Sequence, residues 1–273
     1  MAADVREEEE TNIDAFETAA EEWSNVAEVT AQFSGHDQHH SSGADLCPVS
    51  PLVTVSSITQ HLSTRDDLDQ YLQQIQSSSR RRVSGVRRLL CCLRSPLPPH
   101  LRHTVTLVQA TALIQFSNEE PLHLAMLRTV YRQLTSTTLD CPRYGSHWEM
   151  IGFQGTDPST DLRGVGVLGL VQAVYLVTTP EVAPFSQDIY SLSRSEGQEF
   201  PLLVLSLNIT RITLHVLRDG LLDKLIRLEE DVWTTFNFFY ACLLYHVYHT
   251  WKSRGLTIRD CGPLLQNTEH LAR

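Results

Sequence analysis

The clearest candidate for chemistry in this chain is a single arginine, Arg163, among turn-forming and helix-capping residues. Pro158 cannot lie inside a preceding helix, and residues 159–161 are each good N-cap residues, so a helix is predicted over 161–178. Arg163 would then lie in its first turn, where the helix dipole disfavours a cation by roughly a few tenths of a kcal/mol. A compensating anion is therefore expected, and it is Asp157, Asp161 or a group outside the protein.

The residues around Arg163 form a long pattern that includes Trp148, Gly152, Phe153, Gln154, Pro158, Thr160, Asp161, Arg163, Gly164 and Gly166. This pattern resembles the signature of the ELMO domain, Trp-x3-Gly-Phe-Gln-x3-Pro-x-Thr-Asp-Phe-Arg-Gly-x-Gly. One position departs, because Leu162 stands where the signature has phenylalanine, and this apolar exchange concerns only local packing. The resemblance covers about residues 120 to 273.

The resemblance implies that the chain is a GTPase-activating protein for ARF-like small GTPases in their GTP-bound form. Arg163 corresponds to the arginine proposed to serve catalysis, supplied in trans to the transferring phosphoryl group. Such an arginine suits this step because its planar fork of donors can neutralise charge that develops on the phosphate oxygens. In this interpretation Asp161 holds the guanidinium of Arg163 before docking. The residues predicted to contact the GTPase or to support the site are Asp161, Gln154, Thr160 and Gly164.

Two alternatives stay open. From spacing alone, Arg163 could form a purely structural ion pair with Asp157 or Asp161, and Gln154 could be a structural loop amide. At the level of the whole chain, the alternative function is a non-catalytic adaptor in small-GTPase and actin signalling, because other ELMO-domain proteins act as scaffolds. The resemblance thus leaves open an association with the actin cytoskeleton.

The other residues of the pattern are predicted to be structural: Trp148, Gly152, Phe153, Pro158 and Gly166. Trp148 and Phe153 are expected to anchor the loop to the core. The glycines at 164, 166 and 169 are only a weak signal for a phosphate-binding loop, since no strand precedes them. A close approach between helices explains them better.

Charge is concentrated at one end of the chain. Residues 1–46 contain twelve acidic residues against the single Arg6, a net charge of −11, whereas the whole chain carries −10, so the remainder sums to about +1. Nucleic-acid binding requires a clustered basic face that neutralises phosphates. A nearly neutral folded part therefore argues against a nucleic-acid partner.

The N-terminus and the cysteines favour a cytoplasmic protein. Acidic residues at positions 4 and 7–10 are the opposite of a signal peptide, and no uninterrupted apolar stretch is long enough to predict a transmembrane segment. The six cysteines lack the spacing of a disulfide framework, so reduced thiols are expected.

The sequence predicts an all-α protein, a single helical-bundle domain behind a disordered acidic tail. Residues 1–64 hold too few apolar groups to offset the entropy of ordering, so disorder is expected there. Within the tail, the amphipathic segment from Ile13 to Trp23 could form a helix on a partner. Residues 65–118 are predicted to be a helical lead-in that packs on an ELMO domain at residues 119–273.

Apolar periodicity locates the helices. A helical segment opens at Asp66, a break follows at 77–79, and residues 80–94 form an arginine-rich helix with a solvated face or, alternatively, a contact with an anionic surface. Strand-like alternation is limited to Val53 to Ile58. The apolar stripe from Trp233 to Trp251 predicts a central core helix. Further helices are predicted at 101–116, 121–136, 161–178, 186–194, 198–218 and 229–252.

Other possible chemistry finds little support. His100 and His103, and likewise His246 and His249, could share a helix face, as metal ligands do. Neither pair is accompanied by a carboxylate or cysteine in the pattern of a known site, so neither a metal nor a cofactor is expected. The sequence contains no Gly-x-Ser-x-Gly elbow and no Walker loop, which argues against a serine hydrolase and against nucleotide binding by this chain itself.

Overall fold

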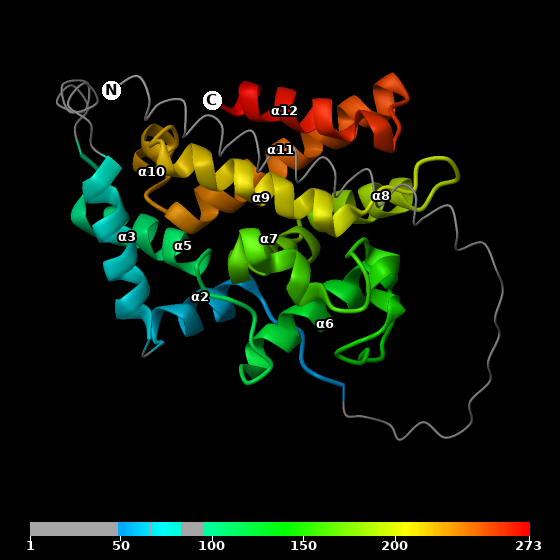
Figure 1. The fold of residues 1–273 in the computed structure, drawn as a ribbon, viewed down its shortest axis with the longest axis horizontal. Coiled ribbons are helices and arrows are strands. Elements are labelled where there is room, and N and C mark those ends of the chain that lie inside the picture. The colour runs from blue at the N-terminus through cyan, green and yellow to red at the C-terminus, as the bar shows by residue number, and fades with distance from the viewer. Residues whose placement is uncertain (1–48, 66, 83–95) are drawn as a thin grey trace.

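A computed structural model describes residues 49–65, 67–82 and 96–273, and every regular element in these ranges is a helix (Figure 1). The expected all-α fold is confirmed. Three short segments are 3-10 helices and the rest are α-helices. In chain order the elements are α2 (Val55–Ser63), α3 (Leu68–Arg82), α5 (Pro99–Thr111), α6 (Pro121–Thr135), η1 (Ser146–Ile151), η2 (Pro158–Gly164), α7 (Gly166–Thr178), α8 (Ala183–Ser193), α9 (Leu202–Arg218), α10 (Asp223–Glu229), α11 (Val232–Arg254), η3 (Ile258–Asp260) and α12 (Cys261–Ala272).

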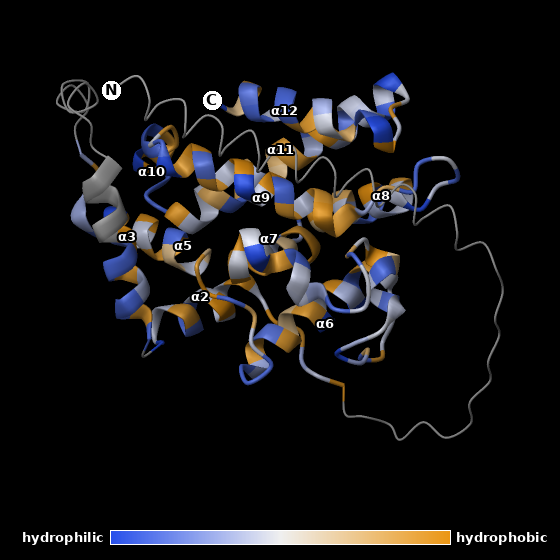
Figure 2. Ribbon diagram, in the orientation of Figure 1, coloured by the Kyte–Doolittle hydropathy of each residue, from blue (hydrophilic) through white to orange (hydrophobic). Residues whose placement is uncertain are grey.

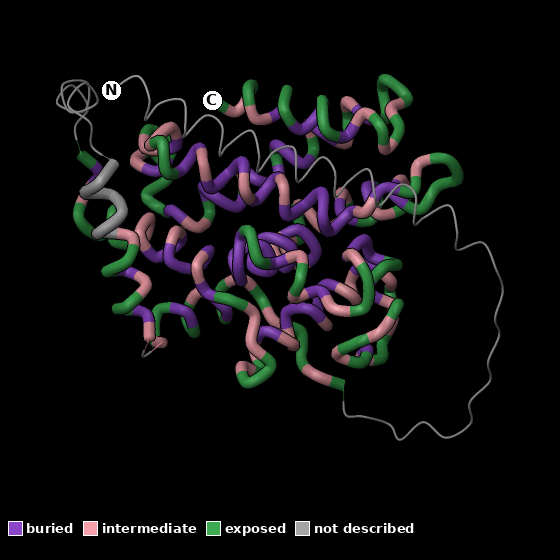
Figure 3. The backbone as a smooth tube through the Cα atoms, viewed as in Figure 1, coloured by how far each residue is buried: buried purple, intermediate pink, exposed green. Residues whose placement is uncertain are grey.

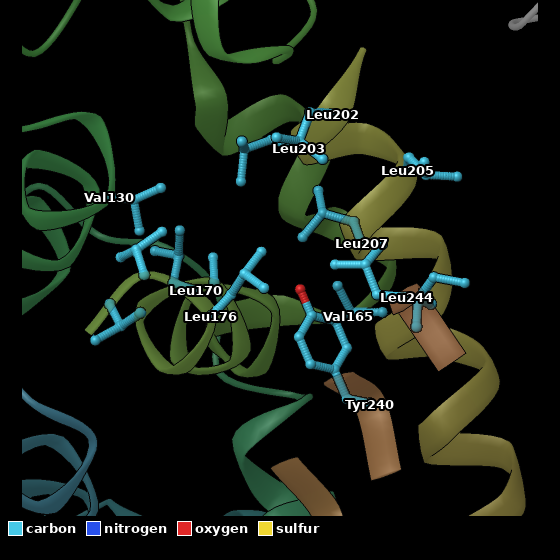
Figure 4. Close-up of a cluster of buried hydrophobic side chains, with 14 of the residues drawn as sticks. Val130, Val165, Leu170, Leu176, Leu202, Leu203, Leu205, Leu207, Tyr240 and Leu244 are labelled. Atoms are coloured by element: carbon cyan, nitrogen blue, oxygen red, sulfur yellow. The ribbon is translucent and has the colours of Figure 1, made fainter. Parts of the chain in front are cut away.

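Helix α7 lies at the centre of the bundle and contacts α2, α5, α6, α8, α9 and α11 (Figures 1 and 3). Nearly all of its residues are buried, because they are apolar on every side, which is typical of a helix enclosed by others (Figure 2). Leu170 and Leu176 from α7 face leucines of α9 and the ring of Tyr240 from α11 (Figure 4). The hydroxyl of Tyr240 is paired with that of Ser206 at 2.6 Å, so this buried polar group is satisfied.

Helix α11 is only partly the central core helix that its apolar stripe predicted. One face packs against α5, α7, α9, α10 and α12. The opposite face reaches the surface, where Phe238 is 61% and Tyr245 53% exposed. The helix predicted over 229–252 starts three residues later, at Val232. Glu230 adopts a left-handed conformation that ends α10, and the Asp231 carboxylate accepts a hydrogen bond from the Thr234 amide at the start of α11.

The prediction of disorder up to residue 64 is wrong for residues 49–64, and the strand-like alternation at residues 53–58 does not form a strand. Residues 55–63 form α2, which begins with a capping box in which Thr54 and Ser57 exchange side-chain and backbone hydrogen bonds. Ile58 and Leu62, four residues apart on one helix face, are 0% and 1% exposed in the main core. The capping box and the burial of these two side chains stabilise a helix here, although β-branched residues favour a strand.

The residues just before α2 are also fixed to the bundle. The amide of Ser50 donates to Oδ2 of Asp140 at 2.7 Å, and Nη1 of Arg132 donates to the Ser50 carbonyl at 2.7 Å. The amide of Val53 donates to Oγ1 of Thr129 at 3.1 Å. Residues 49–64 therefore belong to the packed bundle, which was predicted to begin only at residue 65.

Several boundaries and elements differ from the predictions. Helix α3 continues through the expected break at residues 77–79, and α5 ends at Thr111 instead of residue 116. The α10 turn, η3 and α12 were not predicted as separate elements. The amphipathic segment at 13–23 and residues 83–95, the larger part of the arginine-rich stretch, lie outside the described residues.

In the described ranges, no single helix is long and apolar enough to cross a membrane. The bent pair of η2 and α7 is long and apolar enough only when the two helices are taken together. No cluster of three or more histidine, cysteine or acidic side chains suited to a metal ion occurs in the same residues. Among the described cysteines, Cys141, Cys242 and Cys261 are unpaired.

Candidate functional site

Arg163 lies near the end of the 3-10 helix η2 and not in the first turn of a long helix, so the predicted helix over 161–178 is wrong at its start. Helices η2 and α7 are separate and meet at an angle of 109°. At the bend Gly166 has φ +54°, and a Cβ there would lie 2.5 Å from the Ile114 carbonyl oxygen. This carbonyl accepts a hydrogen bond from the Val167 amide at 2.8 Å. The bend is therefore built on a backbone contact that only glycine permits.

The N-cap of η2 is Asp157 and not one of the three residues after Pro158. Its Oδ1 accepts a hydrogen bond from the Ser159 amide at 2.9 Å. Pro158 occupies the first helical position and is buried, as is Leu162 one turn later. Thr160 donates its hydroxyl to the Asp157 carbonyl at 2.9 Å. Two buried side chains and a cap thus fix this short helix.

Arg163 is exposed, and within the described ranges its side chain makes one hydrogen bond, from Nε to the Thr160 carbonyl at 3.0 Å. The predicted ion pair with Asp157 or Asp161 is absent from the described part of the chain. Asp157 pairs instead with Nη2 of Arg143 at 2.7 Å. No carboxylate among the described residues lies within ion-pair distance of Arg163, so its guanidinium keeps its charge available.

Asp161 supports the site in a different way from the one predicted. Its Oδ2 accepts a hydrogen bond from the backbone amide of Gln154 at 2.7 Å, which ties the loop after η1 to η2. The Gln154 side chain is half-buried and Gly155 is exposed. Asp161 therefore stabilises the loop and does not hold the guanidinium of Arg163.

The loop that carries this site is anchored on the start of α9 through Gly152. This residue has φ +90°, and a Cβ would lie 2.2 Å from the Leu202 amide nitrogen. The Gly152 carbonyl accepts a hydrogen bond from the Val204 amide at 3.0 Å. Trp148 and Phe153 are buried on either side of it, and their rings meet edge to face at 6.2 Å.

The two remaining glycines of the motif differ in their surroundings. A Cβ at Gly169 would lie 2.4 Å from Cδ2 of Leu207, so α7 and α9 approach closely there, as the sequence predicted. At the exposed Gly164, beside Arg163, a Cβ would meet nothing within 4 Å. Packing within the described chain therefore gives no reason for glycine at position 164.

A model of the ELMO/CED-12 family matches residues 106–265, from within α5 to within α12. The chain belongs to the ELMO/CED-12 family. It is 35% identical to human ELMO domain-containing protein 3 over 93% of this chain and 65% of that protein, and 33% identical to the mouse protein over the same shares. Human ELMO domain-containing protein 2 is 28% identical over 50% of this chain and 47% of its own length.

The chain thus spans about 65% of the length of the first curated relatives it matches. No solved structure matches the chain. The matched region contains the whole ELMO signature, whereas α2 and α3 precede it.

Sequence reasoning missed Arg143, which lies beside the ELMO signature and contacts its Asp157. The local sequence Pro142-Arg143-Tyr144 offered only the signal of a cation next to an aromatic ring. Its other ring partner, Phe116, comes from the loop between α5 and α6. Nothing in the sequence spacing pairs these two segments, because only the packing of the bundle brings them together.

Trp148→Ala in this ELMO domain is expected to lower the stability by about 3 to 5 kcal/mol, because the side chain is fully buried and its removal leaves a large cavity. Its Nε1 also donates to the Arg143 carbonyl at 3.0 Å. Thermal melting and soluble yield measure the loss, and Trp148→Phe, which keeps a ring, should lose less. An alanine variant that stays as stable as the parent but loses partner binding would instead place Trp148 at the binding surface.

His123 holds the loop between α5 and α6, which carries Phe116, and is expected to make stability pH-dependent. It is 2% exposed, and its Nδ1 accepts a hydrogen bond from the Ser117 amide at 3.0 Å. Burial lowers the pKa of His123 to about 4 from its ordinary value of 6.5. Its contribution is therefore complete above pH 6.5 and is lost as the pH falls toward 4, since the unfolded chain takes up the proton first.

Between pH 6.5 and 4 the free energy of unfolding can fall by about 3 kcal/mol, because the pKa of His123 is lower in the folded than in the unfolded chain. Melting temperatures of the parent and of His123→Asn between pH 7.5 and 4 measure it. Asparagine can still accept the Ser117 hydrogen bond but does not titrate, so its curve should be flatter in this range. Parallel curves for the two proteins would contradict the role given to His123.

Proposed function

We propose that this chain is a GTPase-activating protein for ARF-like small GTPases and that Arg163 supplies positive charge to GTP hydrolysis in trans. The observation that carries the proposal is the state of the Arg163 side chain. It is exposed, its Nε is fixed to the backbone, and its Nη groups make no hydrogen bond to the described residues. The outer edge of the guanidinium fork is thus left for a ligand.

This arrangement suits phosphoryl transfer for electrostatic reasons. Charge develops on the γ-phosphate and on the bridging oxygen as the bond to the leaving group breaks. A planar pair of Nη donors can meet two of these oxygens at once, whereas a lysine ammonium acts as a point charge. Because Nε is already fixed by the Thr160 carbonyl, less side-chain freedom is lost on docking.

The residues next to Arg163 also support the proposed contact with a GTPase. Thr160 and Gly164 are exposed next to Arg163, and Gly164 leaves open space where a side chain would stand. A partner that approaches the guanidinium closely requires such space. We assign Asp161 and Gln154 to the support of the loop, and Thr160 and Gly164 to the contact with the GTPase.

The proposed partner is a soluble or membrane-associated ARF-like GTPase loaded with GTP, and the proposed location is the cytoplasm. Unpaired cysteines favour this compartment. An association with the cytoskeleton belongs to the adaptor alternative, in which the domain binds a partner without changing its hydrolysis rate. An exposed arginine that has no carboxylate partner in the described part of the chain favours the catalytic function over the adaptor.

Single-turnover hydrolysis tests the proposal. A panel of ARF-like GTPases and one small GTPase of another family are loaded with GTP, and phosphate release is followed with increasing amounts of this chain. Acceleration should saturate and be restricted to ARF-like members, with a size of about 10³-fold or more, as for other arginine-supplying activators. Saturable binding without acceleration on any member would favour the adaptor.

A further inference from the structure

We propose that Arg143 is a positioning residue for the proposed activating site, which fixes η2 and thereby the place of Arg163. The kinetic part of this inference rests on the proposed function, but the structural part does not. Arg143 lies outside the ELMO signature and does not contact Arg163. It acts through Asp157, the residue that caps η2.

The guanidinium of Arg143 is held by two aromatic rings and by a hydrogen bond at its edge. Its Cζ lies 4.5 Å from the ring centroid of Phe116 and 4.5 Å from that of Tyr144, so two aromatic rings enclose it. Its Nε donates to Oδ1 of Asn118 at 2.7 Å. The side chain is only 13% exposed, which is unusual for a charged group without a structural task.

The remaining edge of the fork is directed at the cap of η2. Nη2 of Arg143 donates to Oδ1 of Asp157 at 2.7 Å, and the same oxygen accepts the Ser159 amide at 2.9 Å. Burial alone would raise the pKa of Asp157, but the hydrogen bonds from Ser159 and Arg143 hold it below its ordinary value. The cap therefore stays ionised, and the arginine fixes the position of its carboxylate.

Hydrogen bonds of neighbouring residues connect the same segments. The amide of Gly145 donates to the Thr156 carbonyl at 3.0 Å, and the Arg143 carbonyl accepts Nε1 of Trp148 at 3.0 Å. Arg143 thus joins the loop before α6, the start of η1 and the start of η2. These three segments have no common secondary structure that could hold them together.

Helix η2 depends on such an anchor because it is a single short 3-10 segment that ends in a sharp bend. Arg163 is six residues, about two 3-10 turns, from the Asp157 cap, and its Nε is bound to the carbonyl of Thr160, which lies midway between them. A shift of the cap therefore moves the guanidinium. A displacement of about 1 Å at a reacting group can reduce a rate by about 100-fold.

The test compares Arg143→Lys with the parent chain, Arg163→Lys and a matched control. Lysine keeps the charge but loses the flat fork that stacks between the rings and reaches Asn118 and Asp157 together. Arg132→Lys is the control, because Arg132 is similarly buried at 15% exposure and also pairs with an aspartate, Asp140, at 3.4 Å. Asp157→Asn is a second variant, which can keep the Ser159 cap but not the ion pair.

Hydrogen exchange of the segment 157–165, without GTPase and well below the melting temperature, reports the structural part. We expect exchange to be about 10-fold faster in Arg143→Lys and in Asp157→Asn, and unchanged in Arg132→Lys and Arg163→Lys. Equal exchange in the parent and in both site variants would overturn the inference.

Single-turnover hydrolysis reports the kinetic part. Arg143→Lys should lower the maximal rate about 10- to 100-fold, while the concentration for half-maximal acceleration changes by less than about 3-fold. Faster exchange with an unchanged maximal rate would overturn the positioning role. A parent chain that binds the GTPase without acceleration would contradict the proposed function, and the exchange data would still decide whether Arg143 holds η2.

Discussion

Arg163→Lys is expected to abolish most of the acceleration of GTP hydrolysis while leaving the melting temperature and GTPase binding nearly unchanged. The side chain is exposed, and its single hydrogen bond to the described residues is to the Thr160 carbonyl, so the fold gains little from it. Loss of an activating arginine reduces the rate by roughly 10³- to 10⁵-fold, which corresponds to about 4 to 7 kcal/mol of barrier. Single-turnover rates, binding and melting of the same variant measure all three quantities.

The matched control for this substitution is Arg254→Lys, which changes an exposed arginine in the last turn of α11. It should keep the parental rate. Full acceleration by Arg163→Lys would refute the catalytic role proposed for the planar donor fork, because lysine keeps the charge and loses only the fork. A rate that falls only in proportion to the folded fraction would do the same, and in either case the acceleration would come from residues other than Arg163.

Deletion of residues 1–65 is expected to destabilise the chain strongly, whereas deletion of residues 1–48 should leave the melting temperature of the packed part unchanged. The longer deletion removes α2 with the buried Ile58 and Leu62, and substitutions of such side chains by alanine cost about 2 to 5 kcal/mol each. It also removes the Ser50 amide that binds the buried Asp140 carboxylate. Loss of at least 4 kcal/mol would lower the melting temperature by about 8 to 16 °C.

Leu62→Ala in the full chain provides the intermediate case. It removes one of the two buried side chains and keeps the helix, so its melting temperature should fall between those of the parent and the longer deletion. Equal melting temperatures for chains that begin at Val49 and at Asp66 would show that α2 contributes nothing to the core. A lower melting temperature after the shorter deletion would show that residues 1–48 pack on the bundle.

The sequence alone determined the class of the protein and the place of its candidate site. Helices α6 and α9 were located within a few residues, because their apolar residues recur at helical spacing and this periodicity is a local property. The burial of Trp148 and Phe153 and the close approach at Gly169 also followed from residue types. The ELMO signature pointed to Arg163 because it is a contiguous pattern that needs no tertiary information.

The partners of the site residues were decided by the tertiary structure. Asp157 and Asp161 were both sequence neighbours of Arg163, yet one binds Arg143 and the other the Gln154 amide. The bend at Gly166 separates η2 from α7, since carbonyl groups of a distant loop occupy the space of a Cβ. Local propensity could not reveal either feature, because both depend on contacts between segments far apart in the chain. For the same reason α2 was missed, since its few apolar residues become decisive only when the bundle buries them.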